Sequence, residues 1–350
     1  MNKDFPLQDF EKDDDNSELY EHYRIVADKG QDLLRIDKFL LNRIENVSRN
    51  KIQQTAKAEN ILVNGAVVKQ NYKIKPNDVV TVVFSYPPRI VEIKPEALPL
   101  NIVYEDKYIV IVNKQADLVV HPGHGNYDGT LLNALAYHFE KTGQQIENSY
   151  GYLAHRIDKD TTGLLLITKD ELSQAVMARQ FFNHTIERKY QALVWGDFEE
   201  ESGTITGHIG RSLKDRKVMS VFPDGKFGKE AITHYRVLER FGYVTLVECQ
   251  LETGRTHQIR AHMKHIGHPL FNDNWYGGDR IIKGTSFTKY KQFIDNCFQI
   301  LPRQGLHAKS LGFKHPHTGE QLFFESELPN DISTLLEKWR GYIQSRSFEG

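Results

Sequence analysis

A polar segment that runs directly into an apolar one stands near the middle of the chain, in HRIDKDTTGLLLI. The apolar residues 164–167 show no gaps with a 3.6-residue period, which indicates a short strand buried on both faces. Gly163 permits a backbone conformation that a side chain disfavours, and the Thr161 and Thr162 hydroxyls can bond to turn backbone groups. The pattern therefore predicts a rigid turn that fixes the direction of Asp158.

Residues 33–86 show another pattern, in which two short helices precede a hairpin. The apolar positions of the first predicted helix share one face: Ile36, Phe39, Leu40 and Ile44. Ser48 is a suitable N-cap for the second helix, RNKIQQTAKAENI. The Asn-Gly pair in VNGAVV predicts a turn, and YKIKPNDVVTVVF predicts a further turn and strand. Residues 1–32 are polar, acidic and aperiodic, which predicts a mobile tail.

Residues 87–97 are rich in proline and predict an extended linker, after which residues 98–350 form a second, larger domain. Its first predicted helix follows a glycine-rich loop, with Asp128 as N-cap. Two later helices are predicted, with Asp170 and Thr256 as their N-caps. In the helix after Asp170, the predicted inward residues are Leu172, Ala175 and Val176. The intervening strands alternate apolar and polar residues, which indicates an antiparallel sheet.

Composition and length limit the number of domains and the class of protein. At 350 residues, with 39% hydrophobic and 26% charged residues, the chain is long enough for two globular domains. It shows no apolar segment of membrane-spanning length and no signal peptide pattern, so we expect a cytoplasmic protein that has no membrane partner. Cys249 and Cys297 are far apart and outside any CxxC motif, which suggests neither a disulfide nor a thiolate zinc site.

Charge is segregated along the chain although the net charge is only −1. Residues 1–32 hold four Lys or Arg against ten Asp or Glu, whereas residues 35–83 hold nine against four. A local basic patch suits nucleic-acid binding, because Lys and Arg contacts release counterions from phosphates. A solvated basic face is the alternative. The basic residues concerned lie mostly on the two predicted helices: Arg35, Lys38, Arg43, Arg49, Lys51 and Lys57.

Three motifs resemble one family. GYLAHRIDKDTTGLLL resembles the HRLDxxTSGLLL signature of the RluA/RluD family of pseudouridine synthases, with Ile157 and Thr162 as departures that keep size and chemistry. GRTHQIRAH resembles the family's GRTHQLRxH motif, and LVVHPGHGNYDGTLLNAL is similar to the corresponding stretch. The helix, helix, hairpin order of residues 33–86 resembles the S4 RNA-binding domain, as in the RluD-like branch.

The resemblance implies a fold and a set of roles. The fold would be α/β of the α+β type: a catalytic domain with a mixed, mainly antiparallel sheet, plus a small S4-like α/β domain. Asp158 would be the catalytic carboxylate, Arg260 its ion-pair partner and Tyr190 the aromatic that stacks on the target uracil. Arg156 would enter the RNA stack or hold the flipped nucleotide. The S4-like domain would bind RNA through basic residues: Arg35, Arg49 and Lys51.

The implied activity is isomerisation of uridines in RNA, with large-subunit (23S) ribosomal RNA as the expected partner and no protein partner implied. No cofactor is expected, because the reaction needs no net oxidation and no added group, and neither GxGxxG nor a phosphate loop is present. The family usually has Gly-Asp where Asn272 and Asp273 stand, a departure that we place outside the catalytic set. Asp158 could attack C1′, attack C6 or abstract the 2′ proton, and the sequence leaves these routes open.

Other interpretations remain beside this one. Asp158 could simply bond to its own turn backbone, and Tyr190 could be an ordinary strand aromatic. An RNA-binding protein without catalysis would have no need of the Asp158, Tyr190 and Arg260 set. A glycoside hydrolase would need two carboxylates facing each other, and Asp158 and Asp160 lie in one turn. A histidine-rich stretch invites a metal site but completes no recognisable zinc spacing: His257, His262, His265 and His268.

Overall fold

The computed structural model describes residues 20–44, 47–84, 93–123, 126–144, 146, 148–215 and 217–347. The chain divides into two compact units, residues 1–92 and 93–350. The elements of the first unit are β1 (Tyr20–Val26), α1 (Ile36–Leu41), α2 (Arg49–Lys57), β2 (Ile61–Val63), β3 (Ala66–Val67) and β4 (Val79–Phe84).

The predicted helix, helix, hairpin order of the first unit is confirmed. Its described strands form an antiparallel sheet in the order β1-β4-β2-β3. The Ser48 side chain accepts the Lys51 N–H at the start of α2, as predicted. Asn64 and Gly65 have φ angles of +52° and +83°, the left-handed conformation that a two-residue hairpin turn requires. The four predicted inward residues of the first helical pattern are buried: Ile36, Phe39, Leu40 and Ile44.

The predicted tail of residues 1–32 is wrong from Tyr20 onward, because Tyr20–Val26 forms β1 and pairs with β4. Tyr23 and Ile25 pack against the core of the unit, and Ala27 is buried. An edge strand that needs to cover only part of one sheet face can be mostly polar, and so its composition resembles that of a tail. Residues 1–19 lie outside the described residues.

The second half of the predicted linker is fixed on the second unit. The Asn133 side chain donates to the Lys94 carbonyl at 2.9 Å, and the Glu96 N–H donates to the Asn133 carbonyl at 3.0 Å. The Glu96 carboxylate accepts the Gly129 N–H at 3.0 Å. These contacts place residues 93–97 in the second unit, ahead of the predicted start at residue 98.

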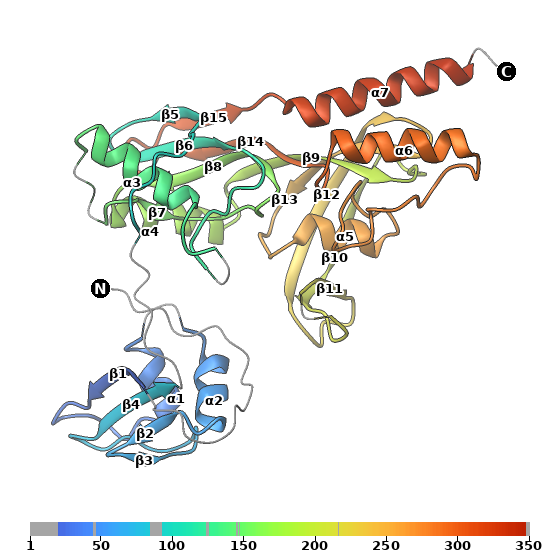
Figure 1. The fold of residues 1–350 in the computed structure, drawn as a ribbon. Helices are drawn as coiled ribbons and strands as arrows, with labels where there is room; N and C mark the ends of the chain where they lie inside the picture. The colour runs from blue at the N-terminus through green and yellow to red at the C-terminus, as the bar shows by residue number, and fades with distance from the viewer. Residues whose placement is uncertain are drawn as a thin grey trace. The chain divides into compact units, whose positions relative to one another are not determined.

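The elements of the second unit are β5 (Ile102–Glu105), β6 (Ile109–Lys114), α3 (Leu131–Lys141), β7 (Tyr152–Leu153), β8 (Thr162–Thr168), α4 (Glu171–Phe182), β9 (Glu187–Trp195), β10 (Ser202–Arg211), β11 (Met219–Phe222), β12 (Lys229–Arg240), β13 (Val244–Leu251), α5 (Gln258–His265), α6 (Thr288–Ile300), β14 (Leu306–Lys314), β15 (Gln321–Glu325) and α7 (Asn330–Ser347). Figure 1 shows α6 and α7 side by side, and their apolar residues share a core with residues of β9 and β13.

One sheet connects the described strands of this unit in the order β11-β10-β12-β13-β9-β14-β8-β6-β5, with β15 on β14 and β7 on β8. Among these described pairings, β8 with β14 is parallel and the others are antiparallel. The predicted fold class, a mixed and mainly antiparallel α+β domain with a small second domain, is therefore confirmed. The parallel pair places the start of β8 beside the start of β14.

The apolar run after the polar turn forms β8 and is buried on both faces, as predicted. Leu165 and Ile167 join the core that α3 and α5 cover, whereas Leu164 and Leu166 join a smaller core on the other face. Met177 of α4 packs in that smaller core. A strand between two helix-covered faces moves little, so the turn ahead of it has a fixed base.

Several details of the predicted helices are wrong. The N-cap of α3 is Thr130 rather than Asp128, and the N-cap of α5 is His257 rather than Thr256. Leu172 is 63% exposed, because α4 turns Ser173 and Met177 toward the sheet instead. Asp170 does cap α4 by accepting the Ser173 N–H. Among the helices of the described residues, none is long and apolar enough to cross a bilayer.

Candidate active site

The turn that carries Asp158 is rigid for reasons that extend beyond the turn itself. The Thr161 N–H donates to the Asp158 carbonyl at 3.1 Å, which closes the turn. Gly163 has a φ of +108°, and a Cβ at this position would lie 2.2 Å from the Ala308 carbonyl oxygen. β14 thus approaches the backbone more closely than any side chain at position 163 would allow. The predicted requirement for glycine here is confirmed.

Two buried basic side chains hold the carbonyls that follow Asp158. The Lys114 amine donates to the Lys159 carbonyl at 2.7 Å, and Arg303 donates to the Asp160 carbonyl at 3.0 Å. Arg303 is in turn fixed by the Asp331 carboxylate at 2.8 and 2.9 Å. Because these two side chains satisfy the turn carbonyls, the turn keeps its shape without using the Asp158 side chain. Sequence reasoning missed both residues, since neither lies in the motif.

An arginine between two carboxylates forms the charged centre of the site. Arg260 donates to the Asp158 carboxylate at 2.9 Å and makes a bidentate pair with Asp273 at 2.7 and 2.8 Å. The Asp273 side chain is fully buried, the Arg260 side chain is 6% exposed and the Asp158 side chain is 21% exposed. Burial alone would lower the pKa of Arg260, but the hydrogen bonds and charges of the two carboxylates raise it. The guanidinium therefore remains charged beside Asp158.

Asp273 is a member of the site that sequence reasoning missed. The Asn272-Asp273 pair was placed outside the catalytic set, yet Asp273 fixes two nitrogens of Arg260. Asn272 has a φ of +56°, and its side chain donates to the Leu301 carbonyl at 2.6 Å. Asparagine tolerates this left-handed conformation better than most residues, which explains why it can stand where the family usually has glycine. Asp273 keeps the aspartate of the family's Gly-Asp pair, and this match was the sequence signal that could have identified it as part of the site.

His257 and Tyr276 border the same centre. The His257 Nε2 atom lies 3.8 Å from the Asp158 carboxylate, and its Nδ1 atom is hydrogen-bonded to the Tyr276 hydroxyl at 3.0 Å. Burial lowers the pKa of His257, so this ring is neutral near pH 7 and adds no positive charge. Burial likewise raises the pKa of Tyr276 to about 12. Arg260 is consequently the cationic partner that Asp158 has at this centre.

A pocket of about 490 Å³ brings the predicted catalytic residues together. Asp158, Tyr190 and Arg260 all line it, as does Arg156, whose side chain is exposed. Tyr190 comes from β9 and is 7% exposed, and burial raises the pKa of its hydroxyl, which therefore stays protonated. Among the described residues that line the pocket, Asp158 is the sole carboxylate.

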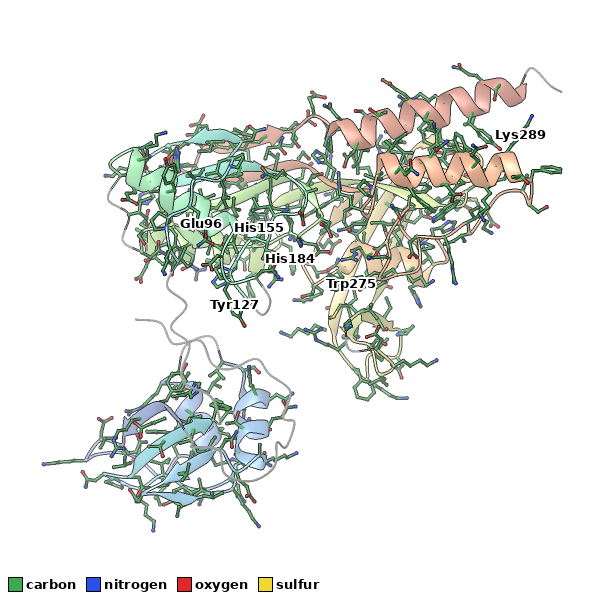
Figure 2. All side chains as sticks on the ribbon, viewed as in Figure 1. Glu96, Tyr127, His155, His184, Trp275 and Lys289 are labelled. Atoms are coloured by element: carbon green, nitrogen blue, oxygen red, sulfur yellow. The ribbon has the colours of Figure 1, made fainter. Side chains whose placement is uncertain are left out.

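The rim of the pocket is formed by elements that neighbour the sheet. His155 and His184, labelled in Figure 2, come from the turn before β8 and from the segment after α4. His155 Nε2 accepts the Leu166 N–H at 3.0 Å, and burial lowers the pKa of this ring to about 3. The ring is thus neutral and holds β8. Trp275, also labelled, is 51% exposed and contacts the Arg260 guanidinium.

The predicted RNA-binding residues lie in the first unit and are partly engaged there. Arg35 and Arg49 both donate to Asp37, at 3.0 to 3.1 Å, and the Asp37 side chain is fully buried. The Gln53 amide donates to the same carboxylate at 2.7 Å. Burial opposes ionisation of Asp37, but these donors lower its pKa below the usual range. The two arginine side chains are still 40% and 45% exposed, and Lys51 is half-buried.

The histidine-rich stretch around α5 forms no metal-ligand cluster. Among the described residues, no group of three or more His, Cys, Asp or Glu side chains could hold a metal ion. His262 instead is buried and bonded to the Thr233 hydroxyl at 2.9 Å, and His268 is bonded to the Trp195 carbonyl at 2.8 Å. These two rings have structural partners.

Comparison with known proteins assigns this fold and site to a family. A family model described as RNA pseudouridylate synthase matches residues 108–265, and an S4 domain model matches residues 34–80. The chain belongs to the RNA pseudouridine synthase family, whose members convert uridine to pseudouridine in RNA. The resemblance to the RluA/RluD family and its S4-bearing branch is thereby confirmed.

Particular relatives cover nearly the whole chain. An uncharacterised RNA pseudouridine synthase of Chlorobaculum parvum is 44% identical over 89% of this chain and 96% of its own. The ribosomal large subunit pseudouridine synthase D of Nitrosomonas europaea is 40% identical over 89% of this chain and 86% of its own. Among solved structures, human RNA pseudouridylate synthase domain containing 4 is 25% identical with a TM-score of 0.53, covering 69% of this chain and 93% of that one.

Proposed function

We propose that this protein isomerises specific uridines of large-subunit ribosomal RNA, with Asp158 as the catalytic carboxylate. The observation that carries the proposal is the pairing of Asp158 with Arg260 at the pocket, at 2.9 Å, while Asp273 holds the arginine from behind. A carboxylate that is partly exposed, paired with an arginine and located at a pocket can act as nucleophile or base. Four relatives bear the name ribosomal large subunit pseudouridine synthase D, which supports this choice of RNA.

The reaction breaks the bond between N1 and C1′ of uridine and forms a bond between C5 and C1′. The C5 proton leaves and a proton is gained at N1, so atoms and charge balance without a cofactor. Attack at C1′, attack at C6 and abstraction of the 2′ proton all require a carboxylate close to the sugar and the base. Asp158 serves each route from the same position, and Tyr190 lines the same pocket with a hydroxyl that stays protonated.

The pocket requires the target base to leave the RNA stack. A base inside folded RNA is not accessible, and extrusion costs a few kcal/mol of stacking and pairing. Tyr190, at the wall of the pocket, stacks on the extruded uracil. Arg156 is exposed at the same pocket and fills the gap or holds the flipped nucleotide.

Two alternatives are less well supported by this geometry. A two-carboxylate glycoside hydrolase needs an acid and a nucleophile that face each other, and among the described lining residues only Asp158 is acidic. A protein that only binds RNA would gain nothing from an arginine fixed by Asp273 beneath a pocket carboxylate.

The first unit contributes affinity for RNA through its S4-like basic face. Arg35, Arg49 and Lys51 contact phosphates, and the two arginines do so with the nitrogens that Asp37 leaves exposed. The cytoplasmic location expected from the sequence fits an enzyme of this substrate class.

Pseudouridine mapping of large-subunit ribosomal RNA tests the proposal. Cells lacking the gene are complemented with the unaltered protein or with Asp158→Asn, and the sites are compared. We expect sites to disappear without the gene and to return only with the unaltered protein. Full restoration by Asp158→Asn would remove the aspartate from the mechanism, whereas no dependence of any site on the gene would show that the substrate is another RNA.

A further inference from the structure

Among the residues that the structure describes, three arginines are buried, and one of them differs from the other two. Arg260 and Arg303 are 5% and 7% exposed, and each makes a bidentate pair with a carboxylate. Arg188 is 7% exposed and forms no ion pair with any described carboxylate. A buried charge ordinarily requires a partner of opposite charge.

The contacts of Arg188 do not supply that partner. Its Nη2 atom donates to the Glu252 carbonyl at a long 3.4 Å, and the guanidinium lies 5.2 Å from the centre of the Phe181 ring. Its Nε atom is buried without a hydrogen-bond partner in the described structure. Burial accordingly lowers the pKa of Arg188, whereas the partners of Arg260 raise its pKa. The guanidinium retains unused donors.

Arg188 faces the pocket that contains Asp158. It precedes Tyr190 by two residues in β9, and both residues line the pocket. Residues two apart in a strand point to the same face and are separated by roughly 7 Å. A Cβ on Gly254 would lie 2.8 Å from the Arg188 Nη1 atom, so the glycine leaves the guanidinium uncovered. The exposed Gly254 thus opens a path from solvent to a buried cation.

We propose that Arg188 binds a phosphate group of the target nucleotide. This inference rests on the proposed function, and it adds a substrate-binding residue to it. Phosphates are the formally charged groups of uridine in RNA, and the planar guanidinium fork matches two phosphate oxygens. With the uracil on Tyr190, the phosphate on Arg188 would lie one strand repeat away. The pocket would then bind the base of the nucleotide at one end and its phosphate at the other.

An RNA fragment that carries a mapped target uridine provides the test, with the full chain as enzyme. Arg188→Gln is expected to raise the half-saturating RNA concentration about 10-fold, to reduce the salt slope of binding by about 1, and to leave the rate at saturating RNA within about 3-fold. Arg188→Lys should recover part of the affinity, because the charge remains without the fork. A rate loss above about 100-fold at saturating RNA, with unchanged affinity, would overturn the phosphate assignment in favour of a contact to the leaving uracil.

Phosphate replacement identifies the contacted group. Fragments are made with a neutral methylphosphonate in place of the 5′ or the 3′ phosphate of the target uridine. One of the two replacements should weaken binding to the unaltered protein about 10-fold. The same replacement should leave the affinity of Arg188→Gln unchanged, because that variant already lacks the contact. Independent, additive losses for both replacements would contradict the proposal.

Gly254→Ala is the second variant, because it keeps Arg188 and fills the opening. Gly254 does not have a left-handed φ, so alanine is compatible with its backbone. We expect a loss of affinity similar to that of Arg188→Gln with unchanged thermal unfolding. If both variants bind the fragment as the unaltered protein does, Arg188 has only a structural role. Binding is measured in Asp158→Asn as well, so a failure of the proposed reaction is distinguished from a failure of this assignment.

Discussion

Both units of the molecule contain a carboxylate bound by arginine, and they use it in opposite ways. In the first unit, one buried carboxylate, Asp37, accepts from two arginines and from Gln53. In the second unit, one arginine, Arg260, serves two carboxylates. The first arrangement therefore has more hydrogen-bond donor groups than carboxylates, and the second has more carboxylates than arginines.

The difference separates a structural ion pair from the one that we propose to be reactive. Asp37 is fully buried, and its donors occupy both oxygens. Asp158 receives a single 2.9 Å bond from the arginine and keeps 21% of its side chain exposed. Asp273 takes the structural role in the second unit, with a fully buried side chain. In this unit Asp273 therefore holds Arg260 in place, while Asp158 keeps the exposure that its proposed role requires.

The largest effect is expected from Asp158→Asn. Asparagine keeps the shape of the side chain but can act neither as nucleophile nor as base, so pseudouridine formation should fall at least about 10³-fold. The free energy of unfolding should change by less than about 1 kcal/mol, since Arg260 keeps Asp273 as partner. Single-turnover pseudouridine formation and thermal unfolding give both quantities. Activity near that of the unaltered protein would show that Asp158 is not the catalytic carboxylate.

Asp273→Asn tests the supporting role. Loss of the bidentate pair lets Arg260 move, and a displacement of about 1 Å can reduce the rate about 10²-fold. The buried Arg260 would lose its bidentate partner and keep only the single bond to Asp158, so the free energy of unfolding should also fall by about 3 kcal/mol. The neighbouring Asn272→Gly, which suits the left-handed backbone, is the matched control and should retain the single-turnover rate. A rate in Asp273→Asn equal to that of the control would show that Arg260 needs no second carboxylate.

Asp37→Asn is the counterpart in the first unit. It removes charged hydrogen bonds to Arg35 and Arg49, and should lower the local stability of this unit by about 2 kcal/mol. Hydrogen exchange of the β2 and β4 amides measures this change in the full chain. The rate of pseudouridine formation at saturating RNA should remain unchanged. A loss of that rate would mean that Asp37 contributes to the reaction and does not have only a structural role.

Acid should weaken the first unit through the same carboxylate. Donation from Arg35, Gln53 and Arg49 lowers the pKa of Asp37, so its contribution to stability is present above the unfolded-state pKa of about 4. The contribution is lost progressively as the pH falls below that value. Hydrogen exchange in the first unit should therefore accelerate below about pH 4 in the unaltered protein. Asp37→Asn should lack this component of the pH dependence.

The smallest effect is expected from Lys51→Ala, which removes a predicted phosphate contact without touching the Asp37 cluster. The salt slope of RNA binding should fall by about 1, with a few-fold loss of affinity at moderate salt. Arg49→Ala should show the same change in slope together with a loss of local stability. An unchanged slope in both variants would remove the S4-like face from the binding model.

Local patterns predicted much of the fold and part of the site. The structure confirms several features that depend on residues a few positions apart. They are the polar turn and buried run of β8, the Asn64-Gly65 hairpin, and the helix caps at Ser48 and Asp170. Edge strand β1 was missed because its weak pattern resembles that of a polar tail. The exposed Leu172 was missed because the packing of α4 on the sheet, and not its own periodicity, chose the buried face.

The sequence by itself determined the chemistry that this protein can perform, because its motifs specify an aspartate, an arginine and a tyrosine of one family. Only the tertiary structure decided how these residues are supported. Asp158 and Arg260 are 102 positions apart, and their 2.9 Å contact exists because α5, which carries Arg260, packs on the same core as β8, which follows the Asp158 turn. The roles of Asp273, Lys114 and Arg188 follow from which charges have partners. Ion pairing depends on distances in space, and no local pattern contains those distances.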